Sequence, residues 1–153
     1  MNKKSTAILV LILVSVSSVV TISEAQTMKS AKEHANSMKI SLRIGDRVLT
    51  ATLIDSATTG DFISLLPLTL TLKDYAGTEK ISDLPKRLST EGAPSGNDPS
   101  VGDITYYAPW GNLAIFYKDF GYSNGLVILG KLDSGIEAFS APGSVKVTIE
   151  LIK

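Results

Sequence analysis

The sequence predicts a mainly β domain, built as a closed antiparallel barrel or as a sandwich of about eight short strands. Short runs that alternate apolar and polar residues recur along the chain, and Gly, Asn, Asp and Pro separate them. Leu113–Tyr117 is instead a continuous apolar and aromatic run, which is typical of a strand covered on both faces. A barrel or the middle of a sandwich provides such cover, so we expect the chain to wrap around this strand.

The N-terminal residues 1–25 have the pattern of a secretory signal peptide. Two lysines precede an apolar run at 7–22, and Ser23 and Ala25 occupy the −3 and −1 positions of a cleavage site. The run is shorter than the roughly 20 residues that a membrane-spanning helix needs. We therefore expect cleavage after Ala25 rather than an uncleaved anchor, and an exported protein that is periplasmic or secreted and free of the membrane.

Residues 26–37 are polar and are predicted to form a flexible leader before a domain at 38–153. His34, the single histidine of the chain, lies in this leader and is expected to be solvated. A serine nucleophile usually needs a histidine base, and zinc sites need Cys or His clusters. The chain has no cysteine, so we expect no thiol chemistry, no metal and no cofactor.

Length, hydrophobic content and net charge indicate the kind of domain and the kinds of partner to expect. The chain has 153 residues, of which 44% are hydrophobic, and its formal net charge is zero. This length and composition suit one domain with a hydrophobic core. Neutrality gives no electrostatic reason to expect a nucleic acid or an anionic membrane surface as a partner.

The first half of the predicted domain contains hairpin, helix and strand signals. Gly45-Asp46 separates two alternating runs, which predicts a β-hairpin with one buried face. Asp55 or Ser56 can cap a short helix that Pro67 ends. The predicted elements are strands at 38–44 and 47–53, a short helix within 55–66, and strands at 68–72 and 78–84.

The second half is organised around a central hairpin at 102–117, with its turn at Pro109-Trp110-Gly111-Asn112. The segment 86–100 is predicted to be irregular, because its Gly- and Pro-rich part should not form a strand. After the hairpin we expect a loop at 118–125, a strand at 126–132, a helical turn at 134–139 and a strand at 144–152.

Acidic residues suggest chemistry only weakly. Asn97, Asp98 and Asp103 lack the spacing of an EF-hand calcium loop, so turn roles are favoured. Carboxylate pairs suited to glycoside hydrolysis are conceivable, but surface and turn roles are again favoured. These pairs are Asp119 with Asp133 and Glu79 with Asp83.

Aromatic residues are concentrated between Tyr106 and Tyr122. One interpretation is packing in the core and at the barrel end. The other is an aromatic-lined cleft for a peptide or a small-molecule ligand. The candidate ligand-binding residues are Tyr107, Trp110, Phe116 and Tyr122, and Trp110 is the strongest because it lies on a turn.

Two stretches resemble the cyclophilin superfamily. Residues 102–108 and 112–117 are similar to its paired central strands, and Asn124–Leu132 is similar to its Val-Val-Phe-Gly-Lys-Val strand. Ala51-Thr52-Leu53 and Leu65–Thr69 further resemble the small bacterial cyclophilin-like domains, a family of uncharacterised function. The resemblance implies a closed antiparallel eight-stranded barrel with one or two short capping helices.

The chain departs from the catalytic pattern of the superfamily. Prolyl isomerases of this fold use an arginine three residues before a proline, and Ser82 takes that position before Pro85. The family histidine is replaced by Leu126, and the glutamine falls near Ala114. The tryptophan position falls near Gly121 or Tyr122.

These departures favour a non-catalytic function. We expect an exported module that binds a peptide or a small ligand. The alternative is a weak or atypical peptidyl-prolyl cis-trans isomerase, in which Phe116 keeps the aromatic floor and Arg87 or Lys86 replaces the missing arginine.

Overall fold

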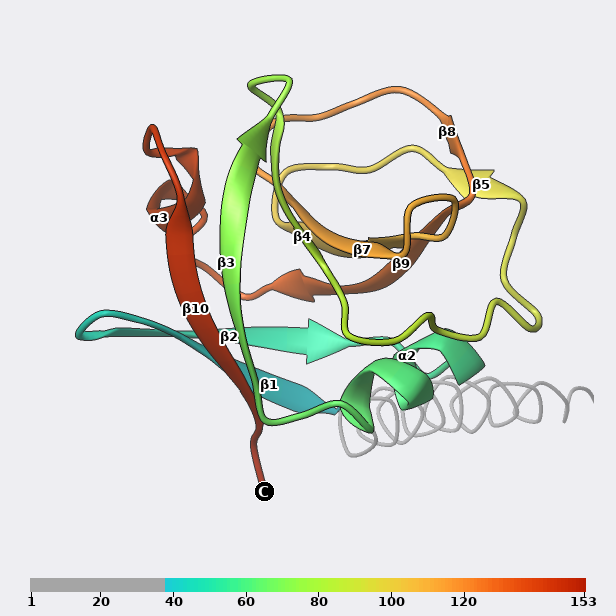
Figure 1. The fold of residues 1–153 in the computed structure, drawn as a ribbon, viewed down its shortest axis with the longest axis horizontal. Coiled ribbons are helices and arrows are strands. Elements are labelled where there is room, and N and C mark those ends of the chain that lie inside the picture. The colour runs from blue at the N-terminus through green and yellow to red at the C-terminus, as the bar shows by residue number, and fades with distance from the viewer. Residues whose placement is uncertain (1–37) are drawn as a thin grey trace, which may run out of the picture. The chain divides into compact units, whose positions relative to one another are not determined.

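The computed structural model describes residues 38–153. The predicted signal peptide at 1–25 and the leader with His34 lie outside the described residues. The barrel strands are β1 (Lys39–Ile44), β2 (Arg47–Leu53), β3 (Leu68–Tyr75), β4 (Glu79–Asp83), β6 (Asp103–Tyr107), β7 (Asn112–Phe116), β9 (Leu126–Leu132) and β10 (Val145–Leu151). They close into a barrel in the order β1-β10-β3-β4-β7-β6-β9-β2, and every pairing is antiparallel (Figure 1). The predicted closed eight-stranded barrel is confirmed.

The first hairpin shows why alternation predicts these strands. Leu42 pairs with Leu49 across β1 and β2, and both side chains are buried, whereas Lys39 and Arg43 are exposed. Gly45 turns the chain with φ of 56°, a conformation in which a Cβ is unfavourable. One face of the hairpin therefore packs into the core while the other meets solvent.

Strand β7 is buried along its whole length, as predicted. Leu113 and Ile115 belong to the barrel core. Ala114 and Phe116 point to the opposite face and form a second cluster with Leu126. Successive side chains of a strand point to opposite faces, so the apolar run supplies both the barrel interior and an apolar patch on its outside.

Two short helices accompany the barrel (Figure 1). Helix α2 (Ala57–Ile63) begins at Ser56, whose Oγ accepts a hydrogen bond of 3.1 Å from the backbone N of Thr59. Helix α3 (Glu137–Ser140) is a single turn. Phe62 from α2 and Phe139 from α3 are fully buried in the core, and these two side chains fix the helices against the barrel. No helix within residues 38–153 is long and apolar enough to cross a membrane.

One prediction about the long irregular segment was wrong. Within 86–100, strand β5 (Gly96–Asn97) pairs with β8 (Ser123–Asn124), which lies in the predicted loop at 118–125. Glycine is required at this pairing, because a Cβ on Gly96 would lie 2.3 Å from the carbonyl oxygen of Ser123. The contact joins distant parts of the sequence, so local composition did not reveal it.

A fully buried lysine lies on the inner face of β4. The Nζ atom of Lys80 donates hydrogen bonds to Asp74 Oδ1 at 3.0 Å and to the carbonyl oxygens of Ala141 and Gly143 at 2.8 and 2.7 Å. The Tyr117 hydroxyl also donates to Asp74 Oδ1, at 2.6 Å. These bonds, with that from Tyr117 the largest cause, lower the pKa of Asp74. Lys80 thereby ties the segment after α3 to the β3–β4 hairpin.

A second polar network lies at the seam where β1, β2 and β9 meet. The carboxylate of Asp133 accepts hydrogen bonds from the hydroxyls of Thr50 and Thr52 and from Lys39 Nζ. These bonds, the Thr50 contact foremost, lower the pKa of Asp133 to about 2. Through these hydrogen bonds Asp133, which follows β9, connects the end of that strand to β1 and β2.

Candidate ligand pocket

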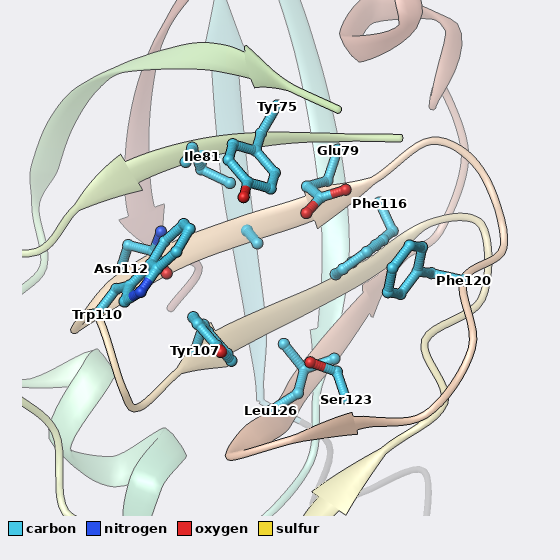
Figure 2. A pocket seen from close by; sticks show the side chains of 11 residues that line it. Tyr75, Glu79, Ile81, Tyr107, Trp110, Asn112, Phe116, Phe120, Ser123 and Leu126 are labelled. Atoms are coloured by element: carbon cyan, nitrogen blue, oxygen red, sulfur yellow. The ribbon is translucent and has the colours of Figure 1, made fainter. Parts of the chain in front are cut away.

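A pocket with a volume of about 200 Å³ opens on the outside of the barrel. It lies over β4, β7 and β6, on the faces opposite to those that fill the core, and we name it the outer pocket (Figure 2). Its lining combines apolar, aromatic and a few polar side chains. They are Tyr75, Glu79, Ile81, Tyr107, Trp110, Asn112, Ala114, Phe116, Phe120, Ser123 and Leu126.

The floor of the outer pocket is the second apolar cluster. Ala114, Phe116 and Leu126 are each no more than 3% exposed, and Ile81 and Tyr107 pack against them. Ala114 sits between Ile81 on β4 and Thr105 on β6 in the strand register. Because these side chains come from adjacent central strands, the barrel itself holds the floor rigid.

Aromatic rings form the walls. Trp110 lies edge-to-face with Tyr75, at 5.4 Å between ring centroids, and with Tyr107, at 5.3 Å. Phe120 packs in a tilted arrangement against Phe116, at 6.3 Å. Figure 2 shows the first group on one side of the hollow and the phenylalanines on the other. Tyr75, Trp110 and Phe120 stay between 42% and 53% exposed, so large apolar surfaces remain uncovered around the cavity.

Glu79 is the charged residue of the lining. Its partial burial raises the pKa of the carboxyl, the negative charge of Asp74 raises this pKa further, and a hydrogen bond from the Thr78 hydroxyl opposes the shift. None of the ion pairs within residues 38–153 involves Glu79. The neighbouring Lys80 cannot neutralise it, since its Nζ is engaged on the inner face of the strand.

Asn112 supplies an unsatisfied polar atom to the wall. The residue is 2% exposed, and its Oδ1 has no hydrogen-bond donor among the residues that the structure describes. Buried acceptors are nearly always paired. Because protein atoms cover Asn112 Oδ1, this acceptor lies behind the surface of the pocket wall and does not face the cavity.

The structure brings together three of the four sequence-predicted residues. Tyr107, Trp110 and Phe116 line the outer pocket, whereas Tyr122 does not. Tyr122 is 56% exposed, and its hydroxyl forms a 2.9 Å hydrogen bond with Ser95 Oγ beside the β5–β8 pairing.

Sequence reasoning missed Tyr75, Glu79 and Asn112 as pocket residues. Tyr75 is the last residue of β3 and Glu79 is the first residue of β4, so the two lie side by side next to the turn that joins these strands. The signal that could have found Glu79 is the period of two, which places it on the same face of β4 as Ile81. That period does not indicate which outer face carries a cavity.

The positions compared with prolyl isomerases fall into two groups. Leu126 and Ala114 belong to the pocket floor, whereas Ser82 does not line the pocket. The guanidinium of Arg87 donates to the carbonyl oxygens of Ala108, at 2.7 Å, and Pro109, at 3.3 Å. Arg87 therefore braces the β6–β7 turn, and the described residues of the pocket lining include no arginine, lysine or histidine.

Residues considered for metal binding take part in turns and strand contacts. Asp103 accepts from the backbone N of Ser100 at 2.8 Å and pairs with Lys131 at 3.2 Å. Asn97 donates to the carbonyl oxygen of Leu126. Asp119, which was considered as one half of a carboxylate pair, accepts from the backbone N of Val101. Within residues 38–153, no group of three or more His, Cys, Asp or Glu side chains is arranged to hold a metal ion.

Comparison with known proteins settles the family. A sequence model of the cyclophilin-like family matches residues 42–150. The chain belongs to the cyclophilin-like family. This confirms the resemblance seen in the central hairpin and in the strand at 126–132.

The cyclophilin-like fold also occurs in a similar solved structure, the solution structure of a hypothetical protein from Archaeoglobus fulgidus. The TM-score is 0.53 and the sequence identity 15%, over 76% of this chain and 95% of that one. At this identity the likeness shows the fold alone. No curated protein matches the chain. The function of this cyclophilin-like domain must therefore be argued from the outer pocket.

Proposed function

We propose that this cyclophilin-like domain is a non-catalytic module that binds a peptide or a small ligand in the outer pocket. The observation that supports the proposal is the apolar floor of Ala114, Phe116 and Leu126, placed on the outside of the barrel and bordered by half-exposed aromatic rings. Small-ligand sites are concave, mostly apolar and equipped with a few polar groups. The outer pocket has each of these properties.

Exposure of the walls adds an energetic reason for binding. Exposed apolar residues that gather around one hollow mark a binding surface more often than residues scattered singly. Trp110 and Phe120 are each at least half exposed and face the hollow from its two sides (Figure 2). A ligand placed between them removes apolar area from water at about 25 cal/mol per Å². The rigid floor means that little ordering entropy opposes this gain.

Export is part of the same proposal. It is supported by the lysines, apolar run and small residues of 1–25. A periplasmic or secreted binding module would meet ligands from the surroundings of the cell.

Trp110 is the single tryptophan of the chain, so its fluorescence reports on the pocket directly. Titration with benzyl alcohol, a neutral aromatic probe, should change the emission with a Kd on the order of 1 mM, as expected for so small a ligand. Phe120→Ala should weaken this binding about fivefold, because one wall is removed. The control is Tyr122→Ala, which removes an exposed ring outside the lining and should change the affinity less than about twofold. An unchanged emission up to saturating probe would contradict the proposal.

Isomerase activity is expected to be absent. Prolyl isomerisation has a barrier of about 18–20 kcal/mol, and lowering it in this fold requires a cationic donor at the substrate carbonyl. The outer pocket offers the carboxylate of Glu79 instead, which has the wrong charge for that role. A protease-coupled assay on an Ala-Pro peptide should give the uncatalysed rate at high protein concentration. A rate that rises in proportion to the protein, and falls in Arg87→Ala, would favour the isomerase.

A further inference from the structure

The outer pocket combines two features that recognise positive charge. Its rings present π faces, whose negative potential attracts organic cations. Trp110 stands nearly perpendicular to both Tyr75 and Tyr107, with interplanar angles of 84° and 82°. Rings set at right angles enclose a corner from several directions, which is the arrangement of an aromatic cage for an ammonium group.

A carboxylate stands at the same hollow. Glu79 lines the pocket next to Tyr75 on β3 and the floor residue Phe116 on β7, which are its partners in the strand register (Figure 2). Within residues 38–153 it forms no ion pair, and the nearby Asp74 adds negative charge. A neutral ligand that covered Glu79 would remove water from the carboxylate without providing a counter-ion, which costs free energy. An anionic ligand would be repelled, so charge complementarity favours a cation.

We propose that the ligand of the outer pocket is a small organic cation, an alkylammonium or arylalkylammonium. This inference rests on the proposed binding function and specifies the ligand class. The apolar body of the ligand lies on Ala114 and Leu126, and the charged nitrogen lies between the aromatic rings and Glu79.

The test compares benzylamine, which is protonated at neutral pH, with benzyl alcohol of nearly the same shape. Wild-type protein should bind benzylamine about tenfold more tightly, because the cation–π contact and the carboxylate act together. Glu79→Gln should reduce this preference to about threefold or less. Asp83→Asn, a matched change at an exposed position of the same strand outside the lining, should keep it.

A further titration distinguishes two sources of the ammonium group, a free amine and a lysine side chain. N-acetyl-lysine methylamide represents a lysine side chain of a partner, whereas benzylamine represents a free amine. Tighter binding of either cation than of benzyl alcohol supports the inference, and the stronger of the two identifies the source. If neither cation binds the wild-type protein more tightly than benzyl alcohol does, the inference is overturned but the proposed binding function stands. Failure of all three probes to bind overturns both.

Discussion

Replacing Gly130 by alanine is expected to destabilise the barrel by about 3 kcal/mol or more, or to prevent folding. Gly130 is buried in β9, opposite Leu53 of β2 and Ile104 of β6. A Cβ added there would lie 2.4 Å from the carbonyl oxygen of Thr52 and 2.9 Å from the Cα of Leu53. Both are backbone atoms of the strand that closes the barrel, so the β2–β9 pairing must separate to admit a methyl group.

Chemical denaturation measures this effect, and Gly60→Ala provides a control with the opposite sign. Gly60 lies within α2, and nothing lies within 4 Å of the place its Cβ would take. The same substitution should stabilise the protein there by about 0.5–1 kcal/mol, because alanine favours the helix and restricts the unfolded chain. A Gly130→Ala protein with the unfolding midpoint of the wild type would show that β2 and β9 are not packed as closely as described.

Lys80→Ala should lower the free energy of unfolding by about 3 kcal/mol. The substitution removes a side chain with 0% exposure and leaves a cavity on the inner face of β4. It also removes the Nζ donor that bonds to Asp74 and to the carbonyl oxygens of Ala141 and Gly143. These hydrogen bonds connect the segment after α3 to the barrel. The loss should appear in both thermal and urea unfolding.

Two further variants separate packing from hydrogen bonding at this position. Lys80→Met fills the cavity without restoring the donors, so its stability should lie between those of the alanine variant and the wild type. Lys146→Ala changes an exposed lysine of β10 and should alter stability by less than about 1 kcal/mol. Similar losses in Lys80→Ala and Lys146→Ala would mean that the buried network does not stabilise the fold.

Much of the barrel could be predicted from local pattern. Alternation in the runs around Gly45-Asp46 predicted β1 and β2, because one face of that hairpin is solvated. The continuous run at Leu113–Tyr117 predicted a strand covered on both sides, and β7 is buried throughout. Both patterns follow from the single rule that successive side chains of a strand point in opposite directions.

The candidate site was predictable only where its residues cluster in the sequence. Tyr107, Trp110 and Phe116 belong to one hairpin, so their proximity follows from the turn between them. Tyr122 belongs to the same aromatic stretch, but the β5–β8 pairing holds it outside the pocket. Sequence distance was therefore a good guide within the hairpin and a poor one beyond it.

The sequence by itself determined the class of fold and the approximate strands, since these depend on residue type and on periodicity along the chain. Tertiary structure alone decided which outer face is hollow and that Glu79 and Tyr75 join the aromatic hairpin there. It also decided that the face of β4 with Lys80 is the inner one, so that this lysine is buried while Glu79 faces the pocket. The physical reason is that closing a barrel brings together strands distant in sequence, and their register places each side chain on one face or the other.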